Sequence, residues 1–201
     1  DVCSSDLYDE PYWRNYLYAI NRRGESGESF HHCKAEIIRS LLSVGYSYYY
    51  LKSRLKKGMQ KQESMIWLLG SSYAAQGIQD AGRPWLSNLS APSQDLFCSN
   101  GLLNCILEAE NHSNGICVLV MGYYVLYDDV SQAGQQIADI MRITYEPLIG
   151  SAHHCAGAKY DIREEIKNRY TILNDDRFRE CENWIGQFFD ENNYFNELYT
   201  R

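Results

Sequence analysis

Apolar side chains recur at helical spacing along most of the chain. The clearest stripe lies between Ser29 and Lys57, where apolar positions repeat every three or four residues. The stripe consists of Ile37, Ile38, Leu41, Leu42, Gly45, Tyr48, Tyr49 and Leu55. Basic residues gather just before Gly58, which is typical of a helix C-terminus. The pattern predicts one long amphipathic helix that ends at Gly58.

Shorter stripes of the same period predict further helices. These stripes cover residues 9–23, 62–80, 102–110, 161–173 and 177–198. Proline and glycine interrupt the pattern between several of them, and such residues commonly end helices.

The longest apolar run, Ile116 to Tyr127 (ICVLVMGYYVLY), is ambiguous. Its β-branched and aromatic residues suit either a strand or a buried helix. A strand by itself would leave its backbone groups unpaired, so a helix that continues through Ile143 is the preferred prediction.

The sequence therefore predicts an all-α fold, a six- to seven-helix single-domain bundle over residues 8–201. The segment near 82–100 (GRPWLSNLSAPSQDLFCSN) is rich in proline, serine and asparagine. Such a composition predicts one long exposed loop.

The first seven residues, DVCSSDL, are interpreted as foreign to the protein. They resemble the translation of a common sequencing-library adapter, so residues 1–7 are excluded from the fold as a non-native scar. The alternative is an authentic mature N-terminus with Cys3 as a real thiol.

Composition limits the classes of function. The 201 residues are 45% apolar and 22% charged, which predicts a globular protein. The net charge of −7 argues against nucleic acid as a partner, because duplex binding depends on a basic surface. No apolar run reaches the roughly 18 residues of a membrane-spanning helix, so no membrane span is expected.

Without Cys3, six cysteines remain, and an even number suits a disulfide framework. They are Cys33, Cys98, Cys105, Cys117, Cys155 and Cys181. Disulfides persist in oxidising compartments, so the sequence predicts a secreted, extracellular protein whose bundle is cross-linked. The alternative is six reduced cysteines packed in the core of a cytosolic protein.

Two glycosylation sequons are compatible with secretion. One begins at Asn88 in the predicted loop and the other at Asn111 near a predicted turn. Triplets of this kind also arise by chance in a chain of this composition, so they permit a glycoprotein without requiring one.

Two identical triplets raise the possibility of a metal site. Residues His31, His32 and Cys33 form the first triplet, and residues 153–155 repeat it as His153, His154 and Cys155. Imidazole and thiolate both ligate zinc and copper. The spacing matches no ordinary zinc motif and a bridged cysteine cannot ligate, so the sequence assigns no metal and no cofactor. The four histidines remain candidate ligands.

No catalytic motif is present, which favours a role other than catalysis. Seventeen tyrosines, several of them in GYSYYYLK (residues 45–52), suit an aromatic surface or a buried helix face. The main functional prediction is protein–protein interaction or self-assembly as a structural subunit. The first alternative is a carrier that binds a small apolar ligand among its helices. The second alternative is a metal-binding protein that uses the two triplets.

Overall fold

The computed structural model describes residues 30–59, 65–80, 82–109, 115–154, 162–170 and 173–191. The chain divides into two compact units. The first unit takes residues up to 46 together with 161–187, and the second takes 47–160 together with the residues from 188 onward. The predicted helix over 9–23 and the segment 1–7 lie outside the described residues.

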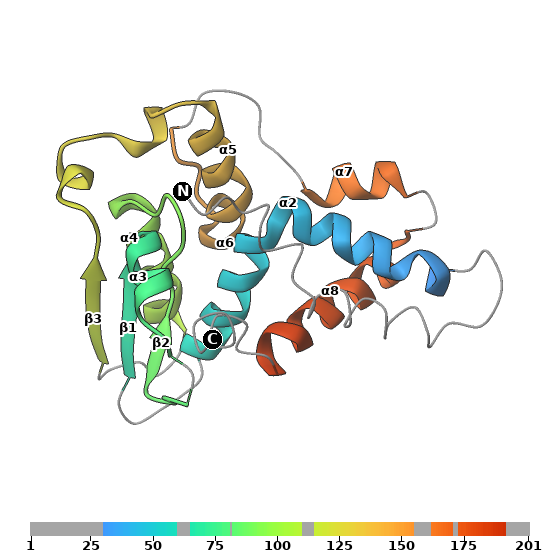
Figure 1. The fold of residues 1–201 in the computed structure, drawn as a ribbon, viewed down its shortest axis with the longest axis horizontal. Coiled ribbons are helices and arrows are strands. Elements are labelled where there is room, and N and C mark those ends of the chain that lie inside the picture. The colour runs from blue at the N-terminus through green and yellow to red at the C-terminus, as the bar shows by residue number, and fades with distance from the viewer. Residues whose placement is uncertain are drawn as a thin grey trace. The chain divides into compact units, whose positions relative to one another are not determined.

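The all-α prediction is wrong, because the second unit contains a three-stranded parallel sheet. The strands are β1 (Met65–Gly70), β2 (Leu86–Asn88) and β3 (Gly115–Val120), in the spatial order β2-β1-β3 (Figure 1). Two of the three were predicted to be helical, and β2 lies in the segment that was predicted to be an irregular loop.

The central strand β1 shows why the pattern was misread. Its sequence, MIWLLG, is buried at every position except Ile66, which is half-buried. Strands of parallel sheets are covered on both faces, so they appear in sequence as continuous apolar runs rather than as alternating ones. A short run of this kind has the same pattern as part of a buried helix.

Helices connect the strands. Helix α3 (Ser72–Gly77) links β1 to β2, and α4 (Leu96–Glu108) links β2 to β3. Both helices pack against β1. Leu68, Ala74 and Leu86 form a buried cluster that joins β1, α3 and β2. A connection therefore follows the carboxyl end of each strand. Parallel sheets commonly bind their ligands at these carboxyl ends.

Gly70 permits the tight exit from β1. Its φ of 137° lies in a region that L side chains rarely adopt. A Cβ atom on this residue would lie 1.8 Å from the carbonyl oxygen of Val120, the residue beside it in β3. Only glycine lets the two backbones approach this closely.

The chain after β3 forms a series of short helices. They are the 3-10 helices η2 (Tyr123–Leu126) and η3 (Val130–Gln132) and the α-helices α5 (Gln135–Thr144) and α6 (Glu146–Ile149). Helix α6 packs on α4 where Gly101 meets Ile149. The buried Tyr145 donates a hydrogen bond from its hydroxyl to the carbonyl oxygen of Pro92 at 2.6 Å, which ties α5 to the loop before α4.

The predicted long helix is present as α2 (Phe30–Gly58), with a kink at Gly45 (φ −124°, ψ 26°). The kink lies at the boundary between the two units. In the second unit, the Trp67 indole N–H donates to the carbonyl oxygen of Gly58 at 3.3 Å. The buried Arg54 guanidinium lies 3.0 Å from a carboxylate oxygen of Asp80, which holds the end of α2 against the loop after α3.

The first unit consists of helices in its described part. The first half of α2 packs there with α7 (Ile162–Arg169) and α8 (Asp175–Glu191). The buried ammonium group of Lys34 pairs with Glu180 and lies 4.4 Å from the ring centroid of Trp184. The hydroxyl groups of Ser40 and Tyr170 are 2.8 Å apart. These contacts connect the two segments of sequence that make up the first unit.

The predicted disulfide framework is also wrong within the described part of the chain. No two of its five cysteines, Cys33, Cys98, Cys105, Cys117 and Cys181, are bonded to each other. Cys98 and Cys181 are fully buried and act as core residues. Burial raises the pKa of Cys181 to about 12. Cys155 lies outside the described residues, as does Cys3. Secretion was inferred from disulfides and stays an untested prediction.

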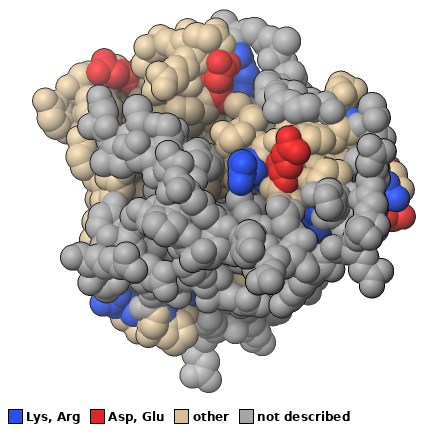
Figure 2. Space-filling view, turned by 45° about the vertical axis from the view of Figure 1, so that its right-hand side comes forward, with Lys and Arg blue, Asp and Glu red and all other residues tan. Residues whose placement is uncertain are grey.

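Among the described residues on the face drawn in Figure 2, the basic and acidic side chains lie in small scattered groups. Two of the basic residues near the end of α2, Arg54 and Lys57, both bind Asp80. No helix among the described residues is long and apolar enough to cross a membrane.

Candidate metal centre

His153 and His154 follow the short helix α6. Gly150 ends this helix in the left-handed conformation (φ 68°), and the chain then turns into the histidine segment. The backbone N–H of His153 donates to a carboxylate oxygen of Glu146 at 3.0 Å, which fixes the segment to the start of α6. The amide of Gln132 also donates to the carbonyl oxygen of His154 at 3.1 Å, so η3 holds the segment from the other side.

Asp95 orients the ring of His153. One oxygen of Asp95 accepts the backbone N–H of Cys98 at 2.8 Å and caps helix α4. The other oxygen lies 2.7 Å from Nε2 of His153, whose side chain is only 3% exposed. An ionised carboxylate accepts hydrogen bonds and cannot donate them, so beside an ionised Asp95 the hydrogen of this bond belongs to Nε2. A neutral imidazole with its hydrogen on Nε2 has its lone pair on Nδ1.

Nδ1 of His153 has no hydrogen-bond partner among the described residues, although it is buried. Leaving a polar atom buried and unpaired costs about 1–3 kcal/mol. Such an atom needs an explanation, and one common explanation is an ion or ligand that binds there. The ring of Phe97, with its centroid 4.5 Å from that of His153, packs against this imidazole and limits its movement.

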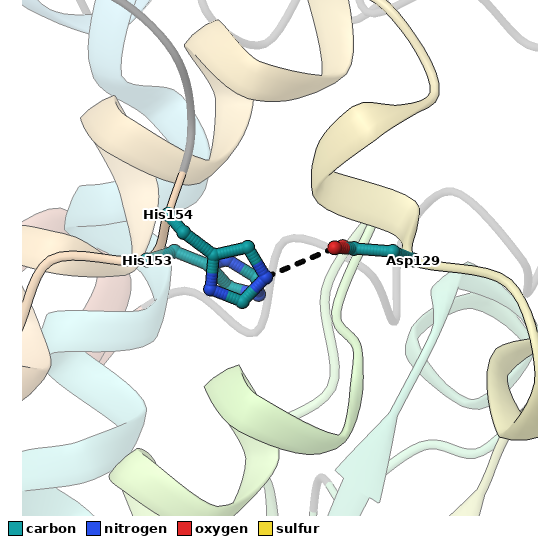
Figure 3. Close-up of side chains that lie close together, drawn as sticks. All are labelled: Asp129, His153 and His154. Atoms are coloured by element: carbon teal, nitrogen blue, oxygen red, sulfur yellow. Dashed lines mark hydrogen bonds and ion pairs between the residues drawn. The ribbon is translucent and has the colours of Figure 1, made fainter.

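Asp129 is positioned by the start of η3. Its Oδ1 accepts hydrogen bonds from the backbone N–H of Ser131 at 3.0 Å and from the hydroxyl of Ser131 at 2.6 Å. Its Oδ2 lies 2.9 Å from Nε2 of His154, and the two side chains point toward one another (Figure 3). The hydrogen bonds from Ser131, and less strongly the one from His154, hold the pKa of Asp129 below its usual value.

Asp129, His153 and His154 each offer one ligand atom, and these three atoms all lie within 4.8 Å of one another. The two rings also lie against each other, with centroids 4.4 Å apart. His153 is buried, whereas the side chains of His154 and Asp129 are 69% and 42% exposed. The cluster thus has a buried, rigid side and a side that is open to solvent.

The sequence identified two of the three residues of this cluster. His153 and His154 were candidate ligands, and the structure brings them together with Asp129. The proposed meeting of two triplets stays untested, because Cys155 and the side chains of His31 and His32 lie outside the described set. Those two histidines belong to the first turn of α2.

Sequence reasoning missed Asp129 and Asp95. Asp128 and Asp129 are adjacent in the sequence and match no catalytic or metal-binding motif, and of the two only Asp129 belongs to the cluster. Asp95 precedes an apolar run in the manner of a helix N-cap, and that local signal was available. Its bond to His153 joins positions 58 residues apart, which no local pattern predicts.

Asn88, the first residue of one sequon, is buried and has a structural role. Asn88 is 1% exposed, and its amide nitrogen donates to the carbonyl oxygens of Ala74 at 3.0 Å and Ile78 at 2.7 Å. A glycan attached to this nitrogen would replace one of its two hydrogens, so at least one of these bonds would be lost, and the buried site leaves no exposed surface for the sugar. We therefore expect Asn88 to be unmodified in the folded protein. Asn111 lies outside the described residues.

Comparison with known proteins gives no further guide to this site, because no protein-family model, curated protein or solved structure matches the chain.

Proposed function

We propose that this protein binds a divalent transition-metal ion, with Zn²⁺ as the preferred ion, through Asp129, His153 and His154. One observation carries the proposal. Nδ1 of His153 is buried and unpartnered within the described residues while Asp95 holds the opposite ring nitrogen. This is the arrangement by which a carboxylate sets the tautomer and orientation of a metal-ligating histidine.

The spacing of the ligand atoms supports the proposal. Ligand atoms about 2.1 Å from a tetrahedral zinc ion lie about 3.4 Å from one another. All three ligand atoms lie within 4.8 Å of one another, so a tetrahedral site needs only small movements of the side chains. The Asp129 oxygen and the His154 nitrogen, which are 2.9 Å apart, must separate by a few tenths of an ångström. Both side chains are exposed and can make this adjustment, while the buried His153 stays in place.

The donor set indicates both the kind of ion and the chemistry. Two imidazoles and one carboxylate suit zinc, iron, copper and nickel better than calcium or magnesium, which favour all-oxygen sites. Three protein ligands leave a coordination position for water, as in catalytic zinc sites. The exposed face of the cluster is where that water would lie. A bound ion there would lower the pKa of the water and supply a hydroxide near neutral pH.

The test is direct titration of the metal-free protein with Zn²⁺ by calorimetry, supported by competition against a chromophoric chelator. We expect one ion per chain. The D129N and H154A variants should each bind at least tenfold more weakly, because each removes one of three ligands. Co²⁺ in place of Zn²⁺ should give the visible absorption of a tetrahedral or five-coordinate site.

Asp128→Asn is the matched control, since it changes the neighbouring carboxylate, which is not part of the cluster. It should bind zinc as the unchanged protein does. The H31A/H32A double variant is a second control, because it removes the other histidine pair of the chain. Wild-type protein that binds no zinc, or D129N and H154A variants that bind it with unchanged affinity, would refute the proposal.

The interaction and carrier functions suggested by the sequence remain separate proposals. The first has support from the exposed apolar strand β3, whose residues Ile116 and Leu119 are 62% and 46% exposed. A protein that presents this strand to a partner need not depend on the metal centre.

A further inference from the structure

Strand β3 is an edge strand that is exposed along almost its whole length. It pairs with β1 on one side, and no described strand pairs with its other side (Figure 1). Positions 115–119 are exposed, in contrast to the buried β1. Strands of parallel sheets are normally covered. A long apolar edge strand offers a row of unsatisfied backbone groups to another strand.

The pairing pattern shows which backbone groups point outward. The carbonyl oxygen of Val120 accepts the N–H of Ser71, so Val120 faces β1. Backbone direction alternates along a strand, and Val118 and Ile116 therefore also face β1. The N–H and C=O groups of Cys117 and Leu119 then point to the open edge. Gly115 completes the outward set.

The edge lacks the features by which proteins prevent strand pairing. Residues 115–127 (GICVLVMGYYVLY) contain no lysine, no proline and no charged side chain. The following helix η2 adds exposed apolar surface, since Tyr123 and Leu126 are 77% and 71% exposed. The strand carries no charge, so two copies of it can meet without local repulsion although the whole chain has a net charge of −7.

We propose that a second copy of this chain covers the edge, by antiparallel pairing of β3 with β3 of the partner about a two-fold axis. A two-fold contact is self-complementary, so the outward groups of one strand meet the same groups of the other. A register with the axis at Cys117 lets this residue exchange both of its backbone hydrogen bonds with its partner copy. It also pairs Leu119 with the partner's Gly115, and the two three-stranded sheets become one of six strands.

This register uses all three outward-facing residues of each copy. An axis at Val118 would pair Cys117 with the partner's Leu119 and leave Gly115 unpaired. The axis at Cys117 therefore gives more backbone hydrogen bonds. It also places the two Cys117 side chains opposite one another. Substitution of this cysteine by residues of like or opposite charge can test this arrangement.

The experiment measures the mass of the full chain by size-exclusion chromatography with light scattering at micromolar concentration. The unchanged protein should have twice the chain mass of 23.3 kDa. C117K and C117E should each have the mass of one chain, because like charges directly opposite one another destabilise a strand pair. An equimolar mixture of C117K and C117E should return to the mass of two chains.

Tyr73→Lys is the matched control. Tyr73 is 67% exposed on α3, which connects β1 to β2 and is not part of β3, so a lysine there should leave the dimer intact. Far-UV circular dichroism should show that all variants keep the fold of the unchanged protein. A bis-maleimide should also join two copies of the unchanged protein through Cys117, and the C117S variant should lose that product. Unchanged protein with the mass of one chain, or a C117K variant that stays dimeric, overturns the proposal.

Discussion

Asp95 and His153 form a hydrogen bond of 2.7 Å that joins the start of α4 to the segment after α6. Asp95 serves two purposes in this arrangement, because one of its oxygens caps α4 and the other selects the tautomer of His153. The pair thus couples the stability of a helix to the ligand properties of an imidazole.

Asp95→Asn should weaken zinc binding about 10- to 100-fold, as is usual when the partner of a ligating histidine is changed. The asparagine oxygen can still cap α4, and its NH₂ group then faces Nε2 of His153. A donor at this place moves the ring hydrogen to Nδ1, which removes the lone pair needed by the ion. Calorimetric titration with Zn²⁺ measures the effect. The thermal stability of the metal-free variant should change little, because asparagine is an equally good N-cap. Unchanged zinc affinity would contradict the assigned tautomer.

Asp80→Asn should lower the free energy of unfolding by about 3 kcal/mol, because it removes the negative charge that compensates the buried guanidinium of Arg54. The two side chains are 8% and 5% exposed, and Asp80 also accepts the backbone N–H of Asn88. Urea denaturation measures the loss. The control is Asp176→Asn, whose partner Arg179 is 3.4 Å away and whose side chain is 86% exposed. That variant should change stability by about 0.5 kcal/mol or less. Equal effects of the two variants would contradict the prediction.

The stability of the protein should fall between pH 10 and about 12, in part because of Tyr50. Burial raises the pKa of this phenol from 10.0 to about 12. Below pH 10 the phenol is protonated in both states. Above it, the unfolded chain ionises while the folded chain does not, so rising pH favours unfolding until the folded pKa is reached.

Tyr50→Phe removes this contribution, so the free energy of unfolding of the variant should decrease less steeply across the same pH window. Denaturation at a series of pH values gives both slopes. The difference between the two proteins at neutral pH gives the separate cost of losing the hydroxyl group. Identical slopes in the alkaline range would show that Tyr50 is not the buried phenol described here.

Gly70→Ala should destabilise the fold by at least about 2 kcal/mol, since it combines backbone strain with a steric clash. The new methyl group would lie 1.8 Å from the carbonyl oxygen of Val120 and push β3 from β1. Gly77→Ala is the matched control, because a Cβ there meets no atom within 4 Å. It should be neutral or slightly stabilising at this helical position. Thermal denaturation distinguishes the two, and a neutral Gly70→Ala variant would contradict the geometry of the β1 exit.

The helices were predicted from sequence where an apolar stripe faces a partner on one side. Helix α2 is the best example, because its 3.6-residue period persists and Gly58 ends it. The strands were missed because β1 is covered on both faces and has no alternation. For β3, the rule that a single strand leaves its backbone groups unpaired is correct, but it was applied without knowing that another strand lies beside β3. Its partner β1 had already been assigned to a helix.

The metal centre was predictable only in part for a similar reason. His153 and His154 are neighbours, so a local pattern identified them. Asp129 and Asp95 reach them from the ends of two different strand-to-helix connections, and this convergence depends on the parallel sheet. Once the sheet was missed, the carboxylates had no reason to be placed near the histidines.

The discontinuity of the first unit has a consequence for biosynthesis. Residues 47–160 are synthesised before 161–187, so the β-sheet unit has most of its chain while the helical unit still lacks its second segment. Lys34 cannot form its ion pair until Glu180, 146 positions later in the chain, has been synthesised. We expect the nascent first half of α2 to remain without its helical partners until translation is nearly complete, which makes it the segment most dependent on chaperones.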